Sequence, residues 1–153
     1  MPKLLKLIVP LLLAALCAGA PVRAADTEEK PAANAGNADF AAGKKAIEAK
    51  DWNGALVAFG KVVKADPKNA DAYNFLGYAN RWLGKMDDSF ANYNKALALE
   101  PNHRGANEYI GVAYLKVKQP AKAQEHLARL EKICGKGCEE YKDLARAIAD
   151  YKP

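Results

Sequence analysis

The sequence predicts an all-α protein built as a solenoid, in which pairs of helices stack one upon the next. Small and apolar residues recur at spacings of three and four, which is the period of an α-helix. Runs of β-branched residues, which favour strands, are nearly absent. A sequence pattern also returns every 34 residues, and a period of that length over three copies is typical of stacked helix pairs.

The beginning of the chain has the features of an export signal. Lys3 and Lys6 make the start positive, residues 4–16 are mostly apolar, and the small residue Ala24 stands where a signal peptidase would cut. The apolar run is too short for a comfortable membrane anchor, although a retained anchor is the alternative. We expect residues 1–24 to be a signal peptide of bacterial style, which predicts a periplasmic or secreted protein without a membrane span after cleavage.

The expected mature chain is close to neutral. The whole sequence holds 23 Lys and Arg against 18 Asp and Glu, and the signal contains basic residues but no acidic ones. A near-neutral chain without a long basic run gives no case for nucleic acid, so we expect no nucleic-acid partner. Residues 25–37 are rich in Ala, Asn and charged residues and lack an apolar period, so we expect a flexible leader.

The repeat is visible in four columns of equivalent positions. Gly43, Gly77 and Gly111 lie 34 residues apart. The same spacing relates Ala55, Ser89 and Ala123, then Phe59, Tyr93 and Leu127, then Val62, Ala96 and Leu130. Small residues allow two helices to approach closely, and the larger column would fill the space between pairs. Pro67 and Pro101 are expected to end helices, because proline lacks an amide hydrogen and restricts the residue before it.

These signals predict six helices in three pairs, followed by a capping helix. The six are expected at about 38–50, 53–65, 70–84, 87–99, 104–117 and 121–133. Asn53 and Asp87 should cap the second helix of their pairs, because short polar side chains accept hydrogen bonds from free amides. Residues 139–151 carry one apolar stripe and should cover the exposed end of the array.

In this register the chain resembles the tetratricopeptide repeat. Residues 36–69, 70–103 and 104–135 look like three successive copies, and the whole repeat domain would span 38–153. The second copy matches best, through Tyr73, Leu76, Gly77, Ser89, Tyr93, Ala96 and Pro101. The departures are Ala42, Asn80 and Gly135, which stand where the family has Leu, Tyr and Pro.

The resemblance implies a concave groove, lined by the first helix of each pair, that binds another protein or a peptide. It would direct into this groove Phe40, Lys44, Asn74, Phe75, Tyr78, Arg81, Trp82, Glu108, Tyr109, Val112 and Lys116. Tyr78 and Trp82 belong to the middle copy and should be the most enclosed, with Arg81 at the rim. Mixed aromatic, cationic and amide side chains are typical of recognition surfaces. The alternative is that several of these aromatics pack between helices.

One subtype of the family grips a C-terminal carboxylate of heat-shock chaperones with Lys, Asn and Arg at fixed groove positions. Only Lys44 and Asn74 lie near such a pattern here, and aromatic residues occupy positions that need polar groups. We therefore do not predict this carboxylate clamp.

Cys134 and Cys138 surround a Gly-Lys-Gly turn. In an oxidising compartment an even pair of cysteines predicts a disulfide, which would clip the turn into the capping helix. The alternative is a thiol redox or soft-metal site. A haem attachment is excluded, because Glu139 follows where His is required.

Nothing in the sequence indicates catalysis. His103 and His126 are expected to be solvent-exposed, and no nucleophile motif, phosphate loop or paired carboxylate set has a useful spacing. The sequence thus predicts a non-enzymatic adaptor, without cofactor or metal, that holds a peptide or partner helix in its groove. Self-association stays open, and a thiol redox or metal-handling protein that uses the cysteine pair is the alternative function.

Overall fold

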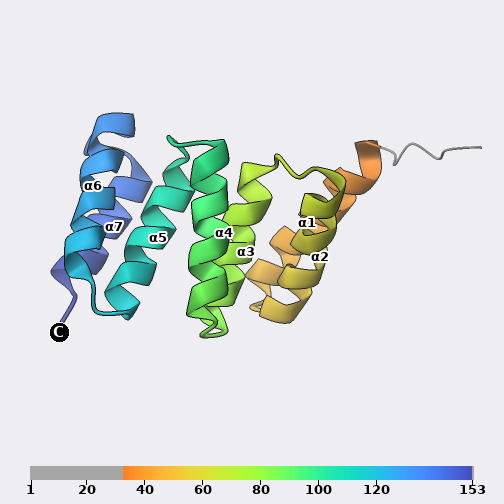
Figure 1. Ribbon diagram of the computed structural model, residues 1–153, viewed down its shortest axis with the longest axis horizontal. Coiled ribbons are helices and arrows are strands. Elements are labelled where there is room, and N and C mark those ends of the chain that lie inside the picture. Colours follow the sequence, from red (N-terminus) through yellow and green to blue (C-terminus); the bar gives the residue numbers. More distant parts are fainter. Residues whose placement is uncertain (1–32, 153) are drawn as a thin grey trace, which may run out of the picture.

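The computed structural model describes residues 33–152, which form a row of seven helices and contain no strand (Figure 1). The expected signal and most of the expected leader lie outside the described residues. The helices are α1 (Ala33–Glu48), α2 (Trp52–Ala65), α3 (Ala70–Trp82), α4 (Met86–Leu99), α5 (Arg104–Lys116), α6 (Pro120–Cys134) and α7 (Glu139–Ala149). The predicted all-α solenoid is confirmed.

The helices pack as three pairs in sequence order. α1 packs on α2, α3 on α4 and α5 on α6, while α2 contacts α3 and α4 contacts α5. The pairs follow one another along the long axis of the molecule, and α7 covers the last pair by packing on both α5 and α6 (Figure 1). Among residues 33–152, no helix is both long and apolar enough to cross a membrane.

The turn inside each pair has the same unusual backbone in all three copies. Lys50, Gly84 and Lys118, which are 34 residues apart, have φ angles of 57°, 75° and 58°. This left-handed residue lets the chain reverse directly after the first helix. The residue that follows donates its amide hydrogen five residues back, as from Asp51 to the Ala46 carbonyl at 2.8 Å.

The second helices start within one residue of the predicted positions, at Trp52, Met86 and Pro120, but the predicted caps are wrong. α2 begins at Trp52 and is capped by Asp51, whose carboxylate accepts from the Gly54 amide at 2.9 Å, not by Asn53. α4 begins at Met86 and its N-cap residue, Lys85, makes no side-chain cap hydrogen bond, so Asp87 lies in the first turn. The physical reason at α2 is that the chain reverses at Lys50, so the next residue, Asp51, takes the capping position. At the N-terminus, α1 begins at Ala33, five residues before the predicted start at 38.

Close packing between the helices depends on the glycine column. A Cβ atom on Gly43 would lie 2.6 Å from the Phe59 ring, and one on Gly77 would lie 2.6 Å from the Tyr93 ring. Contact this short leaves no room for a methyl group. In the third copy the nearest atom to a Cβ on Gly111 belongs to Leu144 of α7, at 2.6 Å, and not to the second helix of the same pair.

The middle pair also holds a buried hydrogen bond in its small-residue column. The Ser89 hydroxyl donates to the Gly77 carbonyl at 2.8 Å, and Ser89 is fully buried. The absence of a side chain at Gly77 leaves its carbonyl accessible to the neighbouring helix. A serine can therefore replace the alanine found at the equivalent positions Ala55 and Ala123.

Candidate functional site

The first helices of the pairs carry a row of aromatic side chains. Phe40 of α1 meets Phe75 of α3 with ring centroids 5.9 Å apart, and Tyr78 of α3 meets Tyr109 of α5 at 4.9 Å. Trp82 lies one turn beyond Tyr78, at 6.2 Å. We call Phe40, Phe75, Tyr78, Trp82 and Tyr109 the aromatic row. The row crosses all three pairs, because the first helices repeat at the same side of the solenoid.

Trp52 also belongs to this surface, although it was not among the predicted residues. Its ring stacks on Trp82 at 5.2 Å with an interplanar angle of 5°, and lies 5.9 Å from Tyr78. Trp52 is the first residue of α2, so a search restricted to first helices misses it. Because Trp52 is at the N-terminus of α2, its ring lies beside Trp82 at the end of α3.

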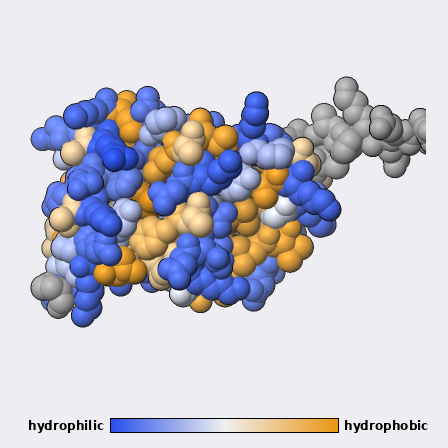
Figure 2. All heavy atoms as spheres, viewed as in Figure 1, coloured by the Kyte–Doolittle hydropathy of each residue, from blue (hydrophilic) through white to orange (hydrophobic). Residues whose placement is uncertain are grey.

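Trp82 differs in exposure from the rest of the row, and also from Trp52, which is partly buried. The Trp82 side chain is 49% exposed, whereas Phe75, Tyr78 and Tyr109 are partly buried. The expectation that Trp82 is enclosed is therefore wrong. It is the last residue of α3 and is half exposed, so part of a large aromatic ring stays available to a partner. On the face seen in Figure 2, apolar side chains gather over α1 and α2, while α6 and α7 are mostly hydrophilic.

Cationic side chains lie against the aromatic rings. The Arg81 guanidinium carbon is 5.0 Å from the Tyr78 centroid, and the Lys116 ammonium is 5.5 Å from the Trp82 centroid. Lys44 places its ammonium 4.7 Å from the Phe75 centroid. Each distance is within the range of a cation–π contact. The predicted residues Lys44, Arg81 and Lys116 thus contact rings of the aromatic row.

Arg81 lies beneath this surface instead of at its rim, which corrects the prediction. The residue is only 7% exposed, and its charge acts on Tyr93, Glu108 and Tyr109. Glu108 is partly buried and faces Asp143 and Glu140 of α7; burial, followed by those two charges, raises its pKa to about 8. Val112, the remaining predicted residue, is partly buried on α5.

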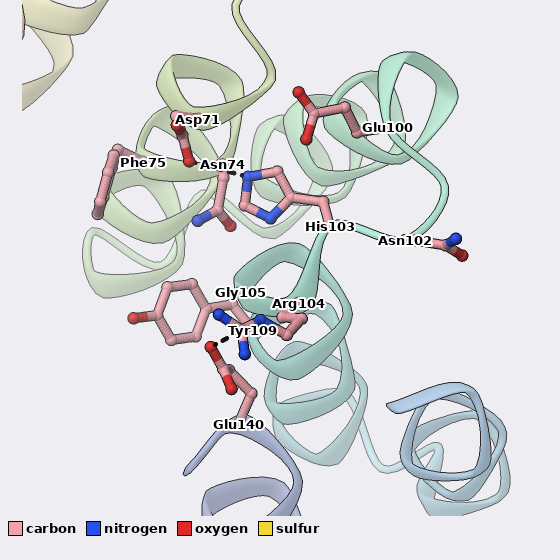
Figure 3. A pocket seen from close by; sticks show the side chains of 10 residues that line it. All are labelled: Asp71, Asn74, Phe75, Glu100, Asn102, His103, Arg104, Gly105, Tyr109 and Glu140. Atoms are coloured by element: carbon pink, nitrogen blue, oxygen red, sulfur yellow. Dashed lines mark hydrogen bonds and ion pairs between the residues drawn. The ribbon is translucent and has the colours of Figure 1, made fainter. Parts of the chain in front are cut away.

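A hollow of about 420 Å³ opens beside the aromatic row, between α3, the start of α5 and the start of α7 (Figure 3). It is lined by Asp71, Asn74, Phe75, Glu100, Asn102, His103, Arg104, Gly105, Tyr109 and Glu140. Of the predicted groove residues, only Asn74, Phe75 and Tyr109 contribute. The acidic residues were not predicted, because they come from helix ends and not from the groove positions that the resemblance selects.

The two histidines are not the exposed residues that the sequence suggested. His103 is the N-cap of α5, where its Nδ1 accepts from the Ala106 amide at 3.1 Å and its Nε2 lies 3.1 Å from an Asp71 oxygen. His126 is buried, stacks on Tyr114 and lies 3.0 Å from the Asn107 amide oxygen. Burial, followed by the nearby Arg129 charge, lowers the pKa of His126 to about 4. Both rings therefore have roles within the fold.

Cys134 and Cys138 are joined by a disulfide bond between the end of α6 and the start of α7. A Glu140 oxygen lies within 4.8 Å of the sulfurs, and the same residue pairs with Arg104 at 3.5 Å. Sulfur bonded in a disulfide is not the thiolate that a soft metal requires. The alternative redox or metal function would therefore need this bond to be reduced.

Comparisons with known proteins agree on the fold. No family model matches the chain. It is 33% identical over 78 residues to the heat shock protein STI1 of Saccharomyces cerevisiae, and 31% identical over 101 residues to a DnaJ protein P58IPK homolog of Arabidopsis thaliana. These matches cover 51% and 65% of this chain but only 13% and 20% of the relatives.

Solved structures with a similar arrangement include several TPR domains, which are domains of tetratricopeptide repeats. The TPR2B domain of yeast Sti1, in a complex with an Hsp70 peptide, has a TM-score of 0.68 at 22% identity. The match covers 78% of this chain and 99% of the TPR2B chain. The crystal structure of MamA has a TM-score of 0.65 at 23% identity, over 74% of this chain and 67% of its own. Residues 33–152 thus have the fold of a tetratricopeptide-repeat domain.

Proposed function

We propose that this protein is a non-enzymatic adaptor that binds a peptide or partner helix across the aromatic row. The observation that carries the proposal is Trp82, which is half exposed, stacked on Trp52 and flanked by Lys116. A rigid, partly exposed aromatic pair beside a cation is the kind of anchor in which binding energy concentrates. The solved TPR2B domain of yeast Sti1, whose fold is similar, is in complex with an Hsp70 peptide, which supports this class of function.

The structure offers a matched pair of variants to test the role of the surface. Trp82 and Val57 are the large hydrophobic residues that stand out as exposed in the described chain, at 49% and 64%. Trp82 belongs to the aromatic row, whereas Val57 lies on α2, outside it. Truncating either side chain to alanine removes exposed apolar surface, but only Trp82→Ala removes the proposed anchor.

The experiment begins with crosslinking capture of partners from the source organism and identification of the main one. We expect Trp82→Ala to weaken its binding by about 2 kcal/mol, or roughly thirtyfold in Kd, while Val57→Ala binds as wild type. Circular dichroism should show unchanged helix content in both variants. Equal binding by Trp82→Ala and wild type, or a loss confined to Val57→Ala, would show that the partner uses another face.

We further propose that the adaptor acts in the periplasm or outside the cell. Two observations support export: the positive and then apolar start of the sequence, and the disulfide between Cys134 and Cys138. Disulfides persist in oxidising compartments. Residues 1–24 lie outside the described structure, so the N-terminal residue of the protein in its native host is what tests this proposal.

A further inference from the structure

The hollow between α3, α5 and α7 has an excess of negative charge. Asp71, Glu100 and Glu140 supply three carboxylates, and Arg104 is the single guanidinium among the lining residues. The Arg104 Nε is 3.5 Å from a Glu140 oxygen, so this cation is already paired. Within residues 33–152, Glu100 forms no ion pair.

His103 does not offset this charge. Its Nδ1 accepts the Ala106 amide hydrogen at 3.1 Å and therefore carries no hydrogen of its own. The ring hydrogen must then be on Nε2, which donates to Asp71 at 3.1 Å. His103 is neutral in this arrangement, and both of its nitrogens are in use.

A buried acceptor in the same hollow lacks a donor. Asn74 is 3% exposed, and its Oδ1 makes no hydrogen bond in the described chain. Figure 3 shows the Asn74 amide extending from α3 toward the start of α5, beside His103. A buried carbonyl oxygen without a donor is unfavourable, and a ligand that brings N–H groups into the hollow would satisfy it.

We propose that this hollow binds the cationic side chain of a lysine or arginine in the partner peptide. The ammonium or guanidinium is neutralised by the carboxylates of Asp71 and Glu100. It donates to Asn74 Oδ1 once that amide, whose oxygen is closed to solvent in the described structure, turns toward the ligand. The Phe75 and Tyr109 rings cover its methylene stem. The proposal rests on the proposed function, because these two rings also belong to the aromatic row.

The volume and the chemistry of the walls agree with such a ligand. A hollow of about 420 Å³ is at the lower end of the range for ligand sites and admits one long side chain. Phe75 already attracts a cation within this chain, since the Lys44 ammonium lies 4.7 Å from its centroid. The hollow therefore combines acceptors, negative charge and an aromatic wall, which are the features that recognise a cation.

An anionic ligand, such as the carboxylate at the end of a peptide, is the competing occupant. The N-terminus of α5 and Arg104 would attract it. Against this, His103 already accepts the Ala106 amide hydrogen, and Glu140 already pairs with Arg104. The two remaining carboxylates, of Asp71 and Glu100, would then repel the anion, so the charge balance favours a cation.

Nuclear magnetic resonance titrations of the ¹⁵N-labelled protein test the proposal with short synthetic peptides. The probe is a capped alanine pentapeptide with a central Lys or Arg. Its controls contain Nε-acetyllysine or Glu at that position, and spermidine represents a free cation. We expect saturable shifts of the Gly105 and Ala106 amides with the Lys or Arg peptide, and none with acetyllysine or Glu.

Variants then connect the binding to the hollow. Asp71→Asn retains an oxygen that accepts from His103, so the double variant Asp71→Asn with Glu100→Gln should keep the fold while raising Kd at least tenfold. Glu125→Gln on α6 removes one exposed carboxylate elsewhere and should leave Kd within twofold. The same loss in Glu125→Gln would indicate attraction to general surface charge and would overturn the proposal.

Three other results would also overturn it. One is a shift of Gly105 and Ala106 with the Glu peptide, which would make the hollow an anion site. Another is unchanged affinity in the double variant. The third is equal or tighter binding of spermidine at the same amides, which would assign the hollow to a free polyamine. Capture of the partner through Trp82 can still succeed in each case, so failure of this proposal is distinguishable from failure of the adaptor function.

Discussion

The packing of α3 on α4 can be tested by adding one methyl group at Gly77. A Cβ there would lie 2.6 Å from two atoms of the Tyr93 ring, and Tyr93 is fully buried, so the ring has little room to move. Overpacking of this kind costs about 1–3 kcal/mol. The replacement also removes a glycine from a helix interior, which is favourable by about 0.5–1 kcal/mol.

Gly60 supplies the control that separates these two effects. It lies in the interior of α2, and a Cβ built on it meets no atom within 4 Å. Gly60→Ala should therefore stabilise the protein by about 0.5–1 kcal/mol. The difference in unfolding free energy between Gly60→Ala and Gly77→Ala isolates the contact with Tyr93, and we expect about 1–3 kcal/mol.

The assay is urea unfolding followed by circular dichroism at 222 nm, with tryptophan fluorescence as a second probe. Coincident transitions from the two probes justify a two-state free energy. In thermal melts, the two variants should differ by roughly 4 °C or more. If Gly77→Ala is as stable as Gly60→Ala, the close approach of α3 to Tyr93 is not as described, and the packing argument for the glycine column fails.

Two further predictions concern the buried histidine and the N-terminus. Burial lowers the pKa of His126 from 6.5 to about 4. As the pH is lowered, the unfolded chain therefore binds a proton on this histidine before the folded chain does. The free energy of unfolding should fall by at most about 3 kcal/mol as the pH drops from 6.5 to 4. In urea titrations at several pH values, His126→Gln should make the free energy of unfolding less dependent on pH between 6.5 and 4. A pH dependence equal to that of wild type would contradict the burial of a neutral His126. For export, mass spectrometry of the protein from its native host should show a chain beginning at Ala25, whereas an intact N-terminus would indicate a retained anchor.

Local sequence signals predicted the helices well where a specific residue ends or starts them. Pro67 and Pro101 follow residues with extended backbone, and α2 and α4 end at Ala65 and Leu99, just before them. The turns inside the pairs were harder, because two of the three left-handed residues are lysines instead of glycines. A lysine in that conformation has no sequence signature, so the reversals before α2 and α6 were not predicted.

Part of the candidate surface was also within reach of the sequence. The predicted residues Phe40, Phe75, Tyr78, Trp82 and Tyr109 do form a continuous row across α1, α3 and α5. The sequence did not predict how far each of these side chains is exposed to solvent. Arg81 and Trp82 are neighbours in sequence, yet one is buried and the other is half exposed, because Trp82 projects from the last residue of its helix.

By itself, the sequence determined the class of fold, because a 34-residue period and helical spacing are local properties that survive without knowledge of the packing. The tertiary structure alone decided which distant side chains meet: Trp52 with Trp82, Gly111 with Leu144, and His103 with Asp71. These pairs are separated by about thirty residues and belong to different helices. Their contacts depend on how one helix pair is set against the next, which no spacing along a single helix encodes.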